Sequence, residues 1–386
     1  MQDIDKELRK HKFVIFGSDH YNTLGAVRSL GEAGICPDVI LHPRYRSNPI
    51  FTNNSKYVRQ VHVVNTVEDG YSLLLNLYGK EQLKPFVYAC DAWVESILDL
   101  HYNDIKNKFI FFHGKEQGIV SRYMDKDAIS NLAKENGLNI PKAELVRKGE
   151  MPKALNFPII TKSRNSTNGG WKEDVYICKS EDELRNVYSK ISSNEILLAE
   201  YIDKEEEFSF DAFSLYGGNT VVMPYTITCL RATPGNYGKY LQYSSVVDKN
   251  IEKSITRMLT TIGFTGLFSA DFLKGKDGKY YFLEINFRNS AFSYPVTFGG
   301  INMLYLWAKG MVMEGDFNYE YKYKEFKALV EIQDFKDYVM THKCSFLKWL
   351  YELTTADCLF YINKNDMKPV YAHVKYIVKK IFRKIF

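Results

Sequence analysis

The sequence lacks the patterns that mark several classes of protein. Its six cysteines are scattered without a C-x-x-C pair, so neither a zinc site nor a disulfide framework is indicated. No apolar run approaches the length of a membrane span. Residues 1–6 are charged and lead into no apolar stretch, so we expect no signal peptide. These absences together predict a cytoplasmic protein.

A strong charge of either sign is also missing. The 51 Lys and Arg against 46 Asp and Glu give a net charge of +5, which implies no nucleic-acid partner. The shares of hydrophobic residues, 45%, and charged residues, 25%, are ordinary for globular proteins. A chain of 386 residues is long enough for two or three domains.

What is present begins with an α/β pattern in the first 115 residues. A helix is predicted from about residue 22, after the first of several buried strands. The predicted strands occupy residues 13–16, 39–41, 61–64, 86–89 and 109–112. Such a unit is Rossmann-like and has a possible ligand crevice at the carboxyl ends of its strands. Because no full G-x-G-x-x-G is present, a dinucleotide site is not favoured.

Two β-prone runs, residues 267–273 and 280–288, flank a short turn rich in Gly and Asp, which predicts an antiparallel hairpin. Side chains alternate between the two faces of a strand. One face of the second strand therefore carries Glu284, Asn286 and Arg288. The other face is apolar and carries Tyr281, Leu283, Ile285 and Phe287. A half-solvated hairpin would also have a polar outer face, so this pattern alone leaves a structural and a functional interpretation open.

Asp271 on the first strand adds a second carboxylate to the polar face. If Gly275 lies opposite Gly278, Asp271 faces Phe282 and lies on the side of Glu284. Carboxylate and amide oxygens suit Mg²⁺, for which Mn²⁺ is a possible substitute, and an Arg fork suits a phosphate or carboxylate. The hairpin thus predicts a metal site formed by Asp271, Glu284 and Asn286, with Arg288 just beyond it.

The spacing D-x12-E-x-N-x-R resembles the metal-binding hairpin of the ATP-grasp superfamily. Those enzymes use ATP to activate a carboxylate as an acyl-phosphate, which a nucleophile, usually an amine, then attacks. Further segments match in the right order. They are Asp125-Lys126 at the start of a helix, Lys162 before the polar loop 163–171, and the acids Glu200 and Glu207, seven residues apart. Short motifs near the N-terminus resemble the D-aspartate ligase branch; they are Leu24-Gly25, Arg28-Ser29-Leu30 and Ser55-Lys56-Tyr57-Val58.

The resemblance implies roles for individual residues. The phosphates of ATP would be held by Lys126, Lys162 and the loop residues Ser166, Thr167, Gly169 and Gly170. Adenine and ribose would be held by Glu200, Tyr201, Ile202 and Glu207. The catalytic candidates are Arg288, which would steady the acyl-phosphate, and Arg231 and Lys239, which we expect in a loop near the γ-phosphate. ATP and Mg²⁺ are the expected cofactors.

We therefore expect an α/β protein with an α+β core. A Rossmann-like domain (1–115) would precede an ATP-grasp domain (116–312, with a lid at about 157–205) and a C-terminal extension (313–386). The last twenty residues carry six Lys and Arg but no acid, and one helix face is apolar; it contains Val374, Ile377, Val378, Ile381, Phe382, Ile385 and Phe386. Such a helix either packs on the body of the protein or lies peripherally on an anionic membrane.

The expected function is an ATP- and Mg²⁺-dependent carboxylate–amine ligase that forms C–N bonds. Its partners would be a small-molecule carboxylate and a small-molecule amine, and an oligomer is possible. One alternative is an ATP-binding protein without turnover that is recruited through its basic tail. Another is an ATP-grasp enzyme of the phosphoryl-transfer or carboxylase type. The sequence names neither substrate.

Overall fold

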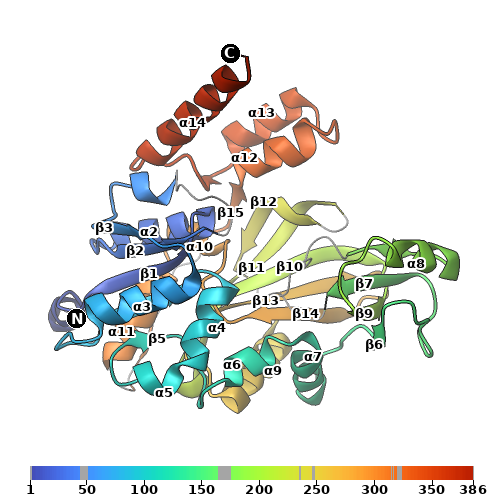
Figure 1. Ribbon diagram of the computed structural model, residues 1–386, viewed down its shortest axis with the longest axis horizontal. Coiled ribbons are helices and arrows are strands. Elements are labelled where there is room, and N and C mark those ends of the chain that lie inside the picture. The colour runs from blue at the N-terminus through green and yellow to red at the C-terminus, as the bar shows by residue number, and fades with distance from the viewer. Residues whose placement is uncertain are drawn as a thin grey trace.

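The computed structural model describes residues 2–43, 51–163, 175–233, 236–245, 248–313, 315, 317–319 and 324–385. The N-terminal part is a five-stranded parallel sheet in the order β3-β2-β1-β4-β5, with helices around it (Figure 1). Its strands are β1 (Phe13–Ser18), β2 (Asp38–His42), β3 (Gln60–Val63), β4 (Phe86–Ala89) and β5 (Ile110–Phe111). Its helices are α1 (Gln2–Leu8), α2 (Tyr21–Glu32), η1 (Thr52–Asn54), α3 (Val67–Tyr78), α4 (Ala92–Leu100) and α5 (Tyr102–Ile105). The predicted Rossmann-like unit is thereby confirmed, and its central strands are buried, as a parallel sheet covered on both faces requires.

Two further sheets follow. The smaller one, in the order β6-β9-β7-β8, lies with its helix at the end of the molecule away from the N-terminal sheet (Figure 1). Its elements are β6 (Ala143–Arg147), β7 (Ile159–Ser163), β8 (Ile177–Cys178), α8 (Glu181–Tyr188) and β9 (Glu195–Glu200), and helices α6 (Ile119–Tyr123) and α7 (Lys126–Glu135) precede them. Because this sheet packs on a small hydrophobic core of its own, it forms a distinct subdomain.

The larger sheet has seven strands in the order β14-β13-β10-β11-β12-β15-β16. Five of them come from the predicted ATP-grasp region: β10 (Lys204–Leu215), β11 (Thr220–Thr233), β12 (Asn236–Ser244), β13 (Gly266–Gly275) and β14 (Tyr280–Asn286). The accompanying helices are η2 (Tyr216–Gly218), α9 (Lys249–Ile262), α10 (Ser293–Phe298) and α11 (Met303–Met313). The core of this sheet is continuous with that of the N-terminal sheet, so the two units form one body.

The hairpin of β13 and β14 forms, but its register differs from the prediction. Asp271 pairs with Glu284, whereas the sequence placed Asp271 opposite Phe282. The cause is a β-bulge, because Phe272 pairs with Phe282 and leaves Leu283 as an extra residue on β14. Phe282 therefore lies in the core, and Leu283, predicted on the apolar core face, instead lines a cavity.

The C-terminal extension completes the larger sheet. Strand β15 (Phe326–Leu329) pairs with β12, and β16 (Cys358–Leu359) pairs with β15. The remaining elements are α12 (Glu331–Asp334), the π-helix η3 (Phe335–Val339), α13 (Phe346–Thr355) and α14 (Lys368–Ile385), of which α13 and α14 lie at one end of the molecule (Figure 1). Among the described residues, no helix is long and apolar enough to cross a membrane. The boundaries predicted at 115 and 312 stay predictions.

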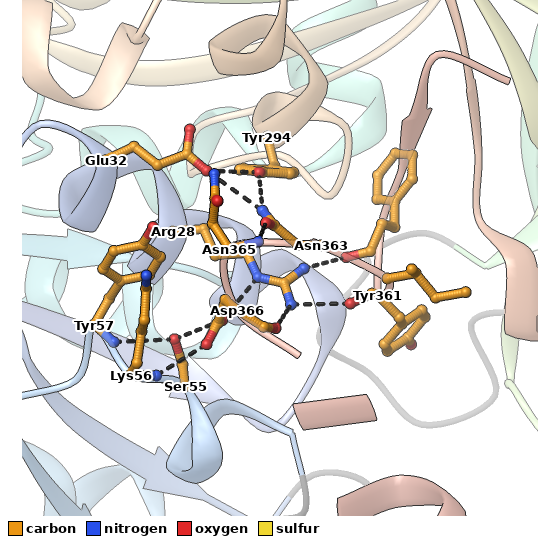
Figure 2. Close-up of polar contacts among 12 residues, drawn as sticks. Arg28, Glu32, Ser55, Lys56, Tyr57, Tyr294, Tyr361, Asn363, Asn365 and Asp366 are labelled. Atoms are coloured by element: carbon orange, nitrogen blue, oxygen red, sulfur yellow. Dashed lines mark hydrogen bonds and ion pairs between the residues drawn. The ribbon is translucent and has the colours of Figure 1, made fainter. Parts of the chain in front are cut away.

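A buried arginine anchors the segment before α14. The Arg28 side chain, 0% exposed, forms an ion pair with Asp366 at 3.0 Å (Figure 2). Its other donors reach the carbonyls of Phe360 at 2.8 Å, Tyr361 at 2.9 Å and Asp366 at 3.0 Å. Because three donor nitrogens of the guanidinium have partners, this cluster stabilises the junction without leaving an unpaired charge.

Asp366 is equally well bonded. Its carboxylate accepts hydrogen bonds from the Ser55 hydroxyl at 2.8 Å and the Lys56 N–H at 2.9 Å. The N-terminal residues of this anchor thus come from the motifs Arg28-Ser29-Leu30 and Ser55-Lys56-Tyr57-Val58, which carried the resemblance to D-aspartate ligases. These motifs hold the C-terminal extension to the N-terminal domain.

Candidate active site

A cavity of about 250 Å³ lies between the smaller and the larger sheet. Eight of the predicted site residues line it together: Lys126, Lys162, Glu200, Tyr201, Ile202, Glu207, Asp271 and Glu284. They come from six different elements and the loop after β9, so the fold gathers segments that are up to 158 residues apart in the chain (284 − 126). A pocket of this kind is the ordinary form of a small-molecule site.

The predicted adenine and ribose residues lie where β9 ends and β10 begins. Glu200 is the last residue of β9, and its side chain accepts a hydrogen bond from the Lys142 N–H at 3.1 Å. Tyr201 and Ile202 follow it and also line the cavity, and the Tyr201 N–H donates to the Pro158 carbonyl at 3.1 Å. Glu207 on β10 forms an ion pair with Lys204 at 2.5 Å.

Two lysines bring positive charge into the cavity. Lys162 lies on β7, and burial together with the charge of Lys126 lowers the pKa of its ammonium group to about 8. Lys126 is the first residue of α7, whose N-cap Asp125 accepts hydrogen bonds from the next N–H groups. A phosphate placed between the two ammonium groups would relieve their repulsion.

The two metal-site carboxylates face each other across the hairpin. Asp271 and Glu284 are direct cross-strand partners, and Asn286 donates to Glu284 at 3.3 Å. Burial, and then the charge of Glu284, raise the pKa of Asp271 well above its usual range. Two adjacent carboxylates and an amide in a partly buried place suit a divalent cation whose remaining ligands are phosphate and water. No group of three or more His, Cys, Asp and Glu suited to a metal occurs in the described ranges, so this mixed set is the candidate.

Arg288 lies just beyond β14 and lines a second, smaller cavity together with Glu284, Asn286 and Lys126. Its guanidinium donates to the Asn286 amide oxygen at 3.3 Å and to the Asn289 carbonyl at 3.1 Å. No carboxylate in the described part of the chain forms an ion pair with it. Its charge therefore remains available to an anionic ligand.

The loop after Arg288 is fixed to the N-terminal sheet. The Asn289 N–H bonds to the Ala89 carbonyl at 3.0 Å, and its side chain donates to Asn22 at 2.5 Å. Asn22 in turn donates to the Cys90 carbonyl at 2.7 Å. These bonds place the guanidinium at the carboxyl end of β4, where the sequence predicted a ligand crevice.

Sequence reasoning missed two groups of site residues. Apolar side chains from both sheets form walls of the larger cavity; they include Ile160, Ile177, Ile227, Leu241, Phe272 and Leu283. The bulge that turns Leu283 outward has no signal in the β-prone run itself. Asp211 on β10 was also missed; it lines neither cavity, but its charge acts on Asp271. Burial raises the pKa of Asp211 to about 7, while the Ser290 hydroxyl and the charge of Arg288 act in the opposite direction. An acid inside an otherwise apolar strand was the available signal.

The catalytic candidates Arg231 and Lys239 do not line either cavity. Arg231 forms ion pairs with Asp334, at 2.8 Å, and with Glu352, so it connects β11 to the C-terminal extension. Lys239 on β12 is 7% exposed. Their catalytic role stays a prediction. The loop residues Ser166, Thr167, Gly169 and Gly170 lie outside the described residues.

The two sheets that enclose the cavity define the class of protein. Residues 125–291 match the family model of the RimK-like ATP-grasp domain, which confirms that this part of the chain is an ATP-grasp domain. The match begins beside Lys126 and ends just after Arg288, so it contains the predicted nucleotide and metal residues.

Individual relatives agree with this class. A D-aspartate ligase of Enterococcus faecium is 23% identical over 319 residues, which are 75% of this chain and 74% of the relative. The L-amino acid ligase of Bacillus licheniformis superposes with a TM-score of 0.60 at 15% identity, over 78% of this chain and 74% of that one. The biotin carboxylase domain of the Hydrogenobacter thermophilus 2-oxoglutarate carboxylase, solved with MgADP and bicarbonate, gives 0.63 at 16% identity, over 82% and 73%. At these identities the two structures show the fold.

Proposed function

We propose that this protein is an ATP-dependent ligase that activates a carboxylate as an acyl-phosphate and joins it to an amine. The observation that carries the proposal is the sequence of charges along one hairpin. The cross-strand pair Asp271–Glu284 lies beside the nucleotide cavity, and Arg288 lies beyond it with no ion-pair partner among the described residues. This is the order in which ATP, metal and activated carboxylate have to follow one another.

In this proposal the chain's own residues bind and orient the reactants. Glu200, Glu207 and the backbone at Tyr201 and Ile202 hold adenine and ribose, while Lys126 and Lys162 hold the phosphates. Asp271, Glu284 and Asn286 would hold Mg²⁺, which when bound neutralises charge on the transferring phosphoryl group. Arg288 orients the carboxylate that receives it.

For the carboxylate we propose an amino acid. The relatives named D-aspartate ligase and L-amino acid ligase act on such compounds, and the chain is aligned with the first over three quarters of its length. A carboxylase reaction is the alternative, because the carboxylase domain with the same fold was solved with bicarbonate.

The test is ADP release from MgATP in the presence of single carboxylates. D-Aspartate, the L-amino acids and bicarbonate are compared, each with and without hydroxylamine. We expect ADP and a hydroxamate from at least one amino acid, since hydroxylamine captures acyl-phosphates. ADP release that depends only on bicarbonate would establish the carboxylase alternative. Absence of turnover with every carboxylate, despite ATP binding, would favour the ATP-binding protein without turnover.

We also propose that the exposed part of α14 meets an anionic membrane. Near the start of the helix, His373 is 8% exposed, and its ring lies tilted against that of Phe51 with ring centroids 4.6 Å apart. Beyond it Val374, Ile377 and Val378 are 42–52% exposed, although they are apolar. Lys375 and Lys379 lie among them and no acid follows Asp366, so the face complements a negatively charged lipid surface.

A further inference from the structure

One buried carboxylate of the N-terminal domain has no hydrogen-bond partner within the ranges that the structure describes. Glu95 on α4 is 1% exposed, and neither of its side-chain oxygens bonds to any described residue. A buried carboxylate without partners costs several kcal/mol of stability, so its presence needs an explanation. Burial, and then the charge of Asp99, raise the pKa of Glu95 well above its usual range, while Arg288 acts in the opposite direction.

The neighbouring acid on the same helix shows what a structural carboxylate looks like here. Asp99 is also 1% exposed, but it accepts hydrogen bonds from the N–H groups of Ser121 at 2.7 Å and Val120 at 3.3 Å. It therefore satisfies the first N–H groups of α6. Glu95 lies one helical turn earlier and does nothing comparable within the described residues.

Glu95 lines the smaller cavity beside the candidate acyl site. The cavity measures about 20 Å³ and is also lined by Lys126, Asn286 and Arg288. That volume holds one group of the size of a water molecule or an ammonium group. The Arg288 guanidinium keeps neutral partners, so it leaves the Glu95 carboxylate available across the cavity.

The geometry points to Glu95 as the residue that binds the ammonium group of the amine substrate. This inference rests on the proposed ligase function and names the site of its second substrate. A cation between Glu95 and the acyl group held at Arg288 would be the positively charged partner that the Glu95 carboxylate does not find among the described residues. The ammonium group would first give one proton to the Glu95 carboxylate, because a nitrogen without a lone pair cannot attack. The resulting amine would then attack the adjacent carbonyl carbon. The C–N bond forms as the C–O bond to phosphate breaks, and the phosphate leaves with the second proton.

The first experiment compares a charged and an uncharged nucleophile. With MgATP and D-aspartate as probe, ADP release is titrated with ammonium chloride and, separately, with hydroxylamine, which is uncharged at neutral pH. We expect Glu95→Gln to raise the half-saturating ammonium concentration at least tenfold and to leave the hydroxylamine reaction within twofold of wild type. Equal losses with both nucleophiles, or no loss with either, would overturn the inference.

Asp99→Asn is the matched control, because it removes a charge of equal burial from the same helix. It should lower the melting temperature and change both nucleophile reactions by the same factor. Glu95→Gln should not lower the melting temperature, since it replaces a charge without partners. A clear drop in the melting temperature of Glu95→Gln would assign Glu95 a structural role.

A binding measurement without turnover separates this inference from the ligase proposal. Ammonium chloride, compared with sodium chloride at equal concentration, should raise the melting temperature of wild type and not of Glu95→Gln. An equal response of wild type to the two salts would refute the ammonium site, even where ligase turnover is found. A specific ammonium response without ADP release from any carboxylate would instead keep Glu95 as an ammonium site and refute the ligase.

Discussion

Two arginines of this protein stand in opposite surroundings. Arg28 is fully buried, and three of its donor nitrogens reach the Asp366 carboxylate and three backbone carbonyls (Figure 2). Arg288 is only partly buried and has neutral partners. Its charge lowers the pKa values of two nearby acids, Asp211 and Glu95, and the Glu95 carboxylate has no hydrogen-bond partner in the described part of the chain. The charged groups around Arg28 all have partners within the protein. The charged groups around Arg288 leave positive and negative charge available to a ligand.

The difference separates stability from function by the same physical criterion. Buried charges that find all their partners within the protein stabilise one arrangement of the chain. Buried charges that lack them cost stability and persist where a ligand supplies the missing partner. Substitutions in the two clusters should therefore move different observables.

The largest effect is expected at the carboxylates next to Arg288. Asp271→Asn or Glu284→Gln should lower substrate-dependent ADP release by about a thousandfold, on the order of 4 kcal/mol, because charge on the transferring phosphoryl group is no longer neutralised. The melting temperature should not fall, since each change relieves repulsion between the two carboxylates. Near-normal rates, or an unfolded variant, would contradict the hairpin geometry.

The complete cluster should give the reverse result. Arg28→Met leaves Asp366 buried without its ion-pair partner, which typically costs about 3–5 kcal/mol of stability. Urea denaturation should show this loss, while the affinity for ATP in the folded protein stays unchanged. Asp366→Asn is the companion variant, and an unchanged denaturation midpoint in both would show that the cluster does not hold the extension.

Substitution of Lys162 tests whether the cavity next to Arg288 binds the phosphates of ATP. Lys162→Ala removes a charge-assisted phosphate contact and should weaken ATP binding by about 1.5–3 kcal/mol in calorimetry. Because the pKa of Lys162 is lowered to about 8, a growing share of the side chain is neutral above that pH in the protein without ATP. ATP binding there should take up a proton, which the phosphates favour. Loss of this uptake in Lys162→Ala would link it to the side chain, and unchanged ATP affinity would remove Lys162 from the site.

Arg288 itself should affect turnover and not nucleotide binding. Arg288→Lys or Arg288→Ala should leave ATP affinity nearly unchanged and reduce substrate-dependent ADP release at least tenfold, about 1.4 kcal/mol. The fork of the guanidinium fits an acyl-phosphate in a way that a point charge does not, so lysine should not rescue. Normal turnover of a true substrate by these variants would show that the acyl group lies elsewhere.

The comparison of the two arginines also shows which features of the protein could be predicted from its sequence. Fixed spacings of chemically demanding residues, such as Glu284-x-Asn286-x-Arg288, predicted the hairpin and its polar face, because strand geometry alone places such residues together. The register could not be predicted, because a bulge at Leu283 depends on how Phe282 packs in the core. The alternation of polar and apolar residues along the strand carries no information about that packing.

Long-range pairing was invisible for the same reason. The catalytic role of Arg231 stays a prediction, but no local pattern indicated its ion pairs with Asp334 and Glu352, more than one hundred residues further along the chain. Nothing in the local sequence distinguishes an arginine that will be neutralised by a distant acid from one that will not. Glu95 and Asp211 were missed for a related reason. A single acid in an apolar element gives no local indication of which residues will surround it in the fold.

The smallest effect on stability and turnover is expected at the end of the chain, where the exposed helix α14 follows the Arg28–Asp366 ion pair. The Arg28–Asp366 cluster fixes the base of α14, and deleting residues 374–386 removes only the part whose described side chains are exposed. Stability and ATP affinity should therefore stay unchanged. Binding to anionic liposomes should fall by at least tenfold, because the deletion removes five basic residues, each of which contributes up to about 1 kcal/mol near the surface. Ile377→Ser with Val378→Ser should weaken binding through lost apolar contact, and Lys375→Glu should weaken it only on anionic and not on neutral vesicles. A truncated protein that aggregates or melts at a lower temperature would show that this helix packs on the body of the protein. The tail would then stabilise the fold, as the Arg28–Asp366 cluster does.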